Sequence, residues 1–454
     1  MPGTRHTWAG WRANTLRKPA STRLGCLSIS LLIGLSASAP LAIGQGTLPR
    51  ATVLNSDHAQ SRLPVTPIAA GSAAATIATS ASLSGDGTQT VFKLQLTKGV
   101  TAEVFTLSDP YRVIIDLPDV GFRLPDATGD GGRGLISAFR YGQFAEGKAR
   151  VVLDAVRPVL ITKAEMTALP AGSGIELAVV LEPTSAQAFG GGTGAASQPA
   201  PAANAATAPS ERPQRAKPII LIDPGHGGID GGAVGSVDLI EKNVVLAVAR
   251  VLQAQLAKTG RYDVRMTRSK DVFVSLDQRL KLSRELVADL FISLHADSIA
   301  DAQAVQSVRG ATVYTLSERA SDEQARRMAE KENASDLIAG INSSTNETGE
   351  VKGILIDLMK RETANYSADF STTLVGKLKQ SVRLSRDPQR SAAFKVLKQT
   401  HAPSVLVELG YLTHPEDQKL LGSAEWRRTV AKSIGQAVDS FFSKRTVGAA
   451  NQSP

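Results

Sequence analysis

The chain has 454 residues, more than one ordinary domain contains, so two or three domains are expected. Its formal net charge is +9, but five positive charges lie in the first 25 residues, and without them 46 basic residues face 42 acidic ones. This small excess of basic over acidic residues does not indicate nucleic-acid binding. The single cysteine, Cys26, also lies near the start, so the rest of the chain has no disulfide, no cysteine-ligated zinc site and no cysteine nucleophile.

Residues 1–44 have the organisation of a secretory signal. A basic start is followed by the apolar, small-residue run LGCLSISLLIGLSASAPLAIG at 24–44. A membrane anchor is the alternative, but Ser and Gly interrupt the run and leave an apolar core too short to span a bilayer. We therefore expect export, cleavage a few residues after the ASA–Pro40 junction, and no stable membrane span after processing.

A small all-β domain is predicted at 74–184, after a polar, flexible leader at 45–73. The segment TVFKLQLT at 90–97 places Phe92, Leu94 and Leu96 on one face with a period of two. Similar segments lie at 112–118, 135–144, 148–156, 159–166 and 174–182. Since no helix-length periodic segment interrupts them, they predict a small antiparallel sandwich or barrel.

Residues 185–217 are rich in Gly, Ala, Pro and Ser and are expected to form a linker. From 218 to 446 strand-like segments alternate with helix-like ones, and 447–454 form a tail. The expected helices include 241–260, with Gly260 as its C-cap, and 275–287, opened by Ser275. The alternation predicts an α/β domain, with a mostly parallel sheet flanked by helices, whose sites lie beyond the carboxyl ends of the strands.

Three predicted strand ends in this α/β domain carry side chains suited to metal chemistry. His226 follows PIILID in a glycine-rich loop, His295 ends LFISLH, and Glu408 ends SVLVE. Glu241 begins a helix fifteen residues after His226, close enough for the loop to fold it back. Two histidines and a carboxylate form a catalytic zinc site when one position stays open for water. A second carboxylate nearby can accept and return a proton.

Each of these residues, taken alone, has an ordinary interpretation. A histidine in a glycine-rich loop is commonly bonded to backbone, His295 could be structural, and Glu408 could be an ion-pair partner. A phosphate-binding loop is a further alternative. The spacing Gly225-x-Gly227-x-x-Asp230 departs from the dinucleotide pattern, however, and lacks the lysine of a P-loop. The combination of four positions favours a zinc site.

Four ordered segments resemble the zinc-dependent N-acetylmuramoyl-L-alanine amidases of the Amidase_3 family over essentially all of 218–444. They are IDPGHGGIDGGAVG with EKNVVLAVA, RMTR at 265–268, FISLHAD, and SVLVELGYLTHPED. The β-domain resembles the AMIN domain, which targets periplasmic members to the cell wall at division sites. The resemblance implies that His226, Glu241 and His295 bind Zn²⁺ and that Glu408 is the catalytic base. It also implies a periplasmic location and, as substrate, the peptidoglycan amide joining N-acetylmuramic acid to L-alanine.

An insertion between GATVYTL (310–316) and Tyr366 is too long for a simple connection. We expect a charged helix at 317–340, capped by Ser317, and a short helix at 354–365 before another at 366–382. Charge alone favours a solvated surface helix. The resemblance implies instead an autoinhibitory insertion at 317–362, in which Glu332, or alternatively Glu330, blocks the zinc until a protein activator displaces the helix.

The sequence departs from the family at His414, where an asparagine is expected, and we interpret His414 as a residue behind the site or on the surface. Two other functions stay open at this point. One is a wall-binding scaffold with a silent metal site, against which the complete ligand set argues. The other is a different zinc hydrolase, a carboxypeptidase or a deacetylase.

Overall fold

The computed structural model describes residues 63–65, 75–125, 128–129, 131–189, 216–235, 239–299, 308–341, 354–399 and 401–450. The predicted signal, most of the predicted leader and linker, and residues 342–353 of the predicted insertion lie outside these residues. All described residues belong to one compact unit, Asp57–Pro454.

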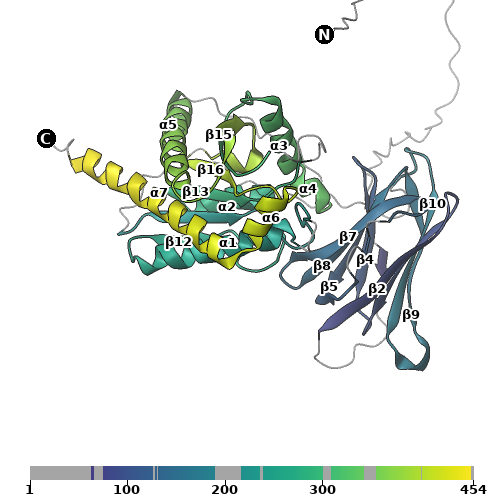
Figure 1. The fold of residues 1–454 in the computed structure, drawn as a ribbon. Coiled ribbons are helices and arrows are strands. Elements are labelled where there is room, and N and C mark those ends of the chain that lie inside the picture. The colour runs from purple at the N-terminus through teal and green to yellow at the C-terminus, as the bar shows by residue number, and fades with distance from the viewer. Residues whose placement is uncertain are drawn as a thin grey trace, which may run out of the picture. The chain divides into compact units, whose positions relative to one another are not determined.

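The N-terminal half is a β-sandwich of two five-stranded sheets (Figure 1). One sheet has the order β1-β4-β5-β8-β7, and the other has the order β6-β2-β3-β10-β9. The strands span Leu63–Val65 (β1), Thr76–Gly85 (β2), Thr90–Leu96 (β3), Ala102–Leu107 (β4), Arg112–Pro118 (β5), Val120–Phe122 (β6), Ile136–Ala145 (β7), Lys148–Ala155 (β8), Val159–Ala168 (β9) and Ile175–Pro183 (β10). Phe92, Leu94 and Leu96 are buried in the core between the sheets, as their alternation predicts. The predicted small all-β domain is confirmed.

The C-terminal half contains a six-stranded sheet of order β12-β11-β13-β16-β14-β15. Its strands span Ile219–Pro224 (β11), Asp263–Met266 (β12), Leu290–His295 (β13), Ala311–Leu316 (β14), Leu384–Ala392 (β15) and Ser404–Glu408 (β16). Every neighbouring pair is parallel except β14 with β16. The prediction of a mostly parallel sheet is therefore confirmed.

Helices cover both faces of this sheet (Figure 1). The helices span Glu241–Lys258 (α1), Leu276–Leu286 (α2), Glu323–Asn333 (α3), Ser335–Ile338 (α4), Ile354–Leu378 (α5), Pro415–Gly422 (α6) and Ala424–Ala450 (α7). On one face, Val245 and Val248 of α1 pack with apolar side chains of α5 and α7. On the other, Leu276 of α2 and Met328 of α3 form a second cluster. None of the described helices is long and apolar enough to cross a membrane.

The helices of the predicted insertion differ from the expected ones. The first helix begins six residues later than expected, because Asp322 caps α3 by accepting from the Ala325 amide, while the Ser317 hydroxyl bonds within a turn. The two helices expected at 354–365 and 366–382 form one continuous helix, α5. Neither glycine nor proline separates the two halves, so nothing in the local sequence breaks the helix.

Candidate metal centre

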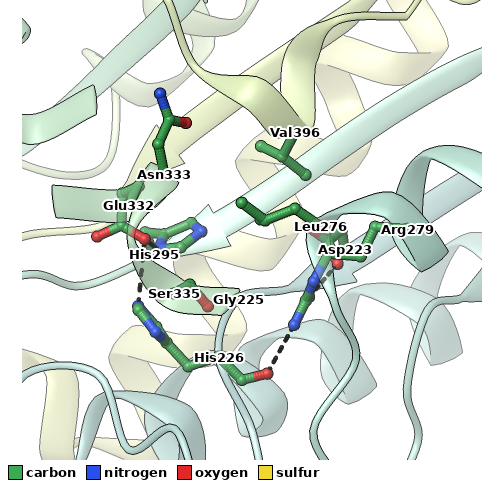
Figure 2. Close-up of a pocket in the computed structure, with 10 residues that line it drawn as sticks. All are labelled: Asp223, Gly225, His226, Leu276, Arg279, His295, Glu332, Asn333, Ser335 and Val396. Atoms are coloured by element: carbon green, nitrogen blue, oxygen red, sulfur yellow. Dashed lines mark hydrogen bonds and ion pairs between the residues drawn. The ribbon is translucent and has the colours of Figure 1, made fainter. Parts of the chain in front are cut away.

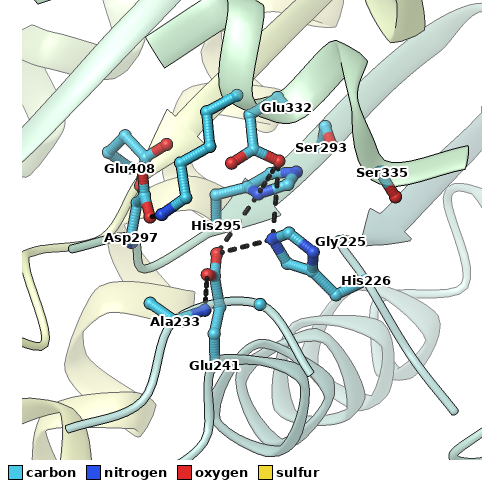
Figure 3. Close-up of polar contacts among 12 residues, drawn as sticks. Gly225, His226, Ala233, Glu241, Ser293, His295, Asp297, Glu332, Ser335 and Glu408 are labelled. Atoms are coloured by element: carbon cyan, nitrogen blue, oxygen red, sulfur yellow. Dashed lines mark hydrogen bonds and ion pairs between the residues drawn. The ribbon is translucent and has the colours of Figure 1, made fainter. Parts of the chain in front are cut away.

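His226, Glu241 and His295 come together at the carboxyl edge of the sheet (Figure 3). His226 follows β11 and His295 ends the adjacent parallel strand β13. Oε1 of Glu241 lies 3.2 Å from Nε2 of His226 and 3.2 Å from Nδ1 of His295. All three side chains are buried. The tertiary structure thus places the three predicted ligands so that one ion could contact all of them.

Backbone and side-chain groups behind the cluster fix the orientation of the candidate ligands. Nδ1 of His226 lies 2.9 Å from Oδ2 of Asp230, so an N–H donated there leaves the lone pair of Nε2 for a metal. Burial opposes the charge of Asp230, but the neighbouring His226 lowers the Asp230 pKa to about 2. The carboxylate of Glu241 accepts from the amides of Ala233 and Ala296, each at 2.8 Å. Sequence reasoning did not give Asp230 this role, although its place four residues after His226 was visible.

The donor set fits a divalent metal ion. Among the described residues, Nε2 of His226 and Nδ1 of His295 are buried without a hydrogen-bond partner. Leaving such groups unpaired is costly, and a metal ion would satisfy both of them. Two imidazoles and one carboxylate form a set that zinc commonly uses in catalytic sites.

The glycines around His226 leave room for the candidate ligands. A Cβ on Gly225 would lie 2.4 Å from Cε1 of His295. Gly232 has a φ of +67°, and a Cβ there would lie 2.6 Å from Oε2 of Glu241. Any side chain at these two positions would displace a candidate ligand, which explains why both are glycine.

A buried arginine of α2 holds the loop that carries His226. Arg279 donates to the carbonyl oxygens of Pro224 and His226 at 2.9 and 2.8 Å, and it pairs with the buried carboxylate of Asp223. Sequence reasoning missed Arg279, because an arginine in an amphipathic helix is typically a surface residue. The contacts indicate that it positions the loop.

Glu408 lies on the strand next to His295. Their Cα atoms are register partners on β16 and β13. Oε2 of Glu408 accepts from the Asp297 amide at 3.1 Å, while Oε1 is buried and has no hydrogen-bond partner among the described residues. Burial, and then the negative charges of Asp297 and Glu241, raise the pKa of Glu408 well above its ordinary value. A raised pKa suits a carboxylate that accepts a proton and returns it during a reaction.

Glu332 reaches the same cluster from the last turn of α3 (Figures 2 and 3). Its Oε2 lies 3.1 Å from Nδ1 of His295 and 3.4 Å from Nε2 of His226. Burial raises the pKa of Glu332 to about 7. Glu330, in contrast, is exposed and pairs with Arg326 on the same helix. Of the two glutamates considered in the sequence, Glu332 is therefore the one that contacts the histidines.

Polar contacts anchor residues 317–341, hereafter the insertion segment, beside Glu332. Lys331 pairs with the buried carboxylate of Asp297, the residue that donates to Glu408. Asn333 donates to the carbonyl of Ala393 at 2.9 Å and accepts from the Lys395 amide at 2.7 Å. These contacts flank Glu332 on both sides and hold it over the histidines.

The insertion segment also contacts groups that orient the site. Ser335 donates to Oδ2 of Asp230 at 2.6 Å, the same oxygen that His226 contacts. Asp336 accepts from the Leu276 amide at 2.9 Å, at the start of the helix that carries Arg279. The position of the segment is thus coupled to the geometry of the cluster.

Little open space remains beside the histidines (Figure 2). The cavity measures about 10 Å³ and is lined by Asp223, Gly225, His226, Leu276, Arg279, His295, Glu332, Asn333, Ser335 and Val396. That volume accommodates about one water molecule. The insertion segment, through Glu332, Asn333 and Ser335, therefore contributes to the wall of this small cavity.

Of the two positions expected for His414, behind the site or on the surface, the surface position is wrong. The side chain is buried, and its Nδ1 accepts from the Glu416 amide at 3.2 Å as the N-cap of α6. Asparagine, the residue expected there, is also a favourable N-cap. The departure from the family pattern therefore preserves a helix cap.

A His–Glu–His cluster at the carboxyl edge of a mostly parallel sheet, with a buried acid on the next strand, defines an α/β protein with a candidate metal-hydrolase centre. Residues 220–440 match the family model of N-acetylmuramoyl-L-alanine amidase, and residues 82–175 match that of the AMIN domain. The chain belongs to the N-acetylmuramoyl-L-alanine amidase family and is an amidase that acts on peptidoglycan. This relationship excludes a carboxypeptidase or a deacetylase as the primary activity.

Two relatives illustrate the relationship. The chain is 38% identical to the amidase AmiA of Escherichia coli K12 over 240 residues, which cover 53% of this chain and 81% of the relative. It is 32% identical to AmiC of Neisseria meningitidis serogroup B over 376 residues, covering 78% and 87%. Among solved structures, the catalytic domain of CwlV from Paenibacillus polymyxa matches 50% of this chain and 98% of that one, with 25% identity and a TM-score of 0.35.

Proposed function

We propose that this amidase is a zinc enzyme that is exported to the periplasm, kept inactive by its insertion segment, and used to split the septal wall when daughter cells separate. His226, Glu241 and His295 hold the zinc, and Glu408 is the base. The observation that carries the proposal is the pair of buried, unpartnered imidazole nitrogens facing two carboxylates, one from Glu241 and one from Glu332.

The reaction follows from the placement of the acids. A zinc ion held by His226, Glu241 and His295 would polarise the scissile carbonyl and lower the pKa of a bound water molecule toward neutrality. Glu408 takes a proton from the attacking water on its unpartnered Oε1 and delivers it to the nitrogen of L-alanine as the amide bond breaks. Asp230 orients the His226 ring so that Nε2 would face a bound ion, and the amides of Ala233 and Ala296 hold Glu241 in place. The products are a free stem peptide and the lactyl carboxylate of N-acetylmuramic acid.

Inhibition follows from the position of Glu332. A carboxylate beside both imidazole nitrogens occupies the place that water needs, and the cavity of about 10 Å³ excludes glycan. Activity then requires withdrawal of the insertion segment, and we assign that step to a protein activator.

The cellular role rests on the chain's organisation. The signal-like residues 1–44 suit export, and the AMIN match lies within the expected β-domain of 74–184. The proposed domain organisation also includes a linker at 185–217 and a catalytic domain at 218–446. Export and wall targeting together place the amidase at the site of cell separation.

Digestion of purified sacculi tests the proposal. The mature protein is stripped with a chelator and reloaded with zinc, and the released fragments are identified by mass spectrometry. We expect free stem peptides, without released terminal residues or acetate. They should appear only when the protein is loaded with zinc and the insertion segment is withdrawn from the metal centre. Glu408→Ala should keep the zinc and release nothing. A chain that folds with all three ligands intact yet binds no zinc would overturn the proposal.

A further inference from the structure

Two arginines of the AMIN domain contact the end of the insertion segment. Nη1 of Arg112, on β5, donates to the carbonyl oxygen of Leu337 at 2.6 Å. Nη1 of Arg150, on β8, donates to the carbonyl oxygens of Ala339 and Gly340 at 3.0 and 3.3 Å. Leu337 lies in α4, and Ala339 and Gly340 directly follow it. Carbonyl oxygens at the C-terminal end of a helix carry partial negative charge, so cations stabilise this end.

Both arginines are built into the β-sandwich. Arg112 is 1% exposed and Arg150 is 2% exposed, and buried guanidinium groups require paired donors. Arg150 forms a two-point ion pair with Asp116, at 2.5 and 2.9 Å, and its guanidinium carbon lies 3.5 Å from the ring centre of Phe144. Asp116 and Phe144 fix the direction of the Arg150 side chain, so the contact with the insertion segment is preorganised.

Apolar packing accompanies these hydrogen bonds. Ala339 is fully buried, in a cluster with Ile114 and Val152 from the same two strands as the arginines. Gly340 has a φ of +70°, and a Cβ there would lie 2.6 Å from Cδ1 of Ile114. The backbone of the insertion segment therefore lies directly on the AMIN sheet, a few residues after Glu332.

We propose that the AMIN domain clamps the insertion segment in its closed position, so that separating the AMIN sheet from residues 337–340 loosens Glu332 over the metal centre. This inference rests on the proposed autoinhibition and assigns to the AMIN domain a regulatory contact within the same chain. The contacts of Lys331, Asn333 and Ser335 hold the segment from the catalytic side, and Arg112 and Arg150 hold its end.

Hydrogen exchange of the zinc-loaded mature chain tests the clamp from both sides. Arg112→Ala removes a clamp residue from the AMIN side. Ala339→Asp places a charge in the buried cluster from the insertion side and leaves the sandwich sequence unchanged. Arg140→Ala is the matched control, because Arg140 pairs with Asp154 within the same sheet. Peptides covering 323–341 report the insertion segment, and peptides covering β3 and β10 report the fold of the sandwich.

We expect at least about tenfold faster exchange of 323–341 in both variants, wild-type exchange in the control, and protected β3 and β10. Hydrolysis of sacculi should rise with the exchange. Wild-type exchange of 323–341 in Ala339→Asp would overturn the clamp, even if Arg112→Ala disturbs the sandwich. Faster exchange without faster hydrolysis would support the clamp and overturn the proposed autoinhibition, so the two failures are distinguishable.

Discussion

The carboxylate of Glu332 lies 3.1 Å from Nδ1 of His295, the nitrogen that also lies 3.2 Å from the carboxylate of Glu241. The two residues are far apart in the sequence, and the contact unites the insertion segment with the candidate metal centre. A carboxylate held there would compete with any water or substrate carbonyl that approaches a bound metal ion. Under the proposed autoinhibition, the closed insertion segment therefore prevents turnover at this site.

Removing that carboxylate should activate the enzyme. Glu332→Ala deletes a charged contact worth about 1.5–3 kcal/mol to the closed state, so basal hydrolysis of sacculi should rise about tenfold or more. Glu330→Ala is the matched control, because Glu330 is exposed on the same helix and pairs with Arg326. Equal hydrolysis by wild type and by zinc-loaded Glu332→Ala would contradict the blocking role.

Removing the hydrogen bonds of Asn333, next to Glu332, should also activate the enzyme while the Glu332 carboxylate is still present. Asn333→Ala removes the hydrogen bonds to Ala393 and Lys395, which we expect to weaken the closed state by about 1–2 kcal/mol. Limited proteolysis within 323–341 should become faster, and basal hydrolysis should rise several-fold. Unchanged cleavage of this segment would show that Asn333 does not hold it.

Loss of the base should abolish turnover without loss of the metal. Glu408→Gln keeps the size of the side chain but cannot accept the proton, and general-base catalysis contributes about 10²–10⁴-fold to such reactions. The rate should be measured in the Glu332→Ala background, where activity is high enough to quantify. Zinc content should match that of the parent. A variant with parental hydrolysis would remove Glu408 from the mechanism.

The acid limb of the pH profile should also report on Glu408. Burial and the charge of Asp297 raise its pKa well above the ordinary value, and the base works only when ionised. Values of kcat/KM should therefore fall as the pH drops through that raised pKa. Asp297→Asn removes a negative neighbour, which lowers the pKa and moves the limb to lower pH. An acid limb at the same pH in both proteins would argue against this assignment.

Zinc should stabilise the folded chain through the three ligands. A ligand that binds only the native state at about one hundred times its Kd adds about 2.7 kcal/mol. The increment appears as a higher Tm of the catalytic domain on zinc addition to chelated protein. His226→Ala should reduce the increment strongly, whereas His401→Ala, outside the cluster, should keep it. A zinc-independent Tm would count against the site.

The sequence by itself determined most of the strands and helices and indicated metal chemistry at the strand ends. Period-two alternation gave β3 with its buried Phe92, Leu94 and Leu96, and Ser275 marked the start of α2 with a capping box. The order of strands and helices gave the mostly parallel sheet. The edge strand β15 was missed because its residues are largely polar and its apolar pattern is weak.

Only the tertiary structure decided which side chains meet. Local patterns place His226, His295 and Glu408 at strand ends, but the β11-β13-β16 order brings those ends side by side. Local patterns also give Glu330 and Glu332 the same charged helix, and the packing of α3 alone turns one of them toward the histidines. The contacts of Arg112 and Arg150 with residues 337–340 join segments almost two hundred residues or more apart. Such contacts depend on how elements pack, because short-range propensity contains no information about distant partners.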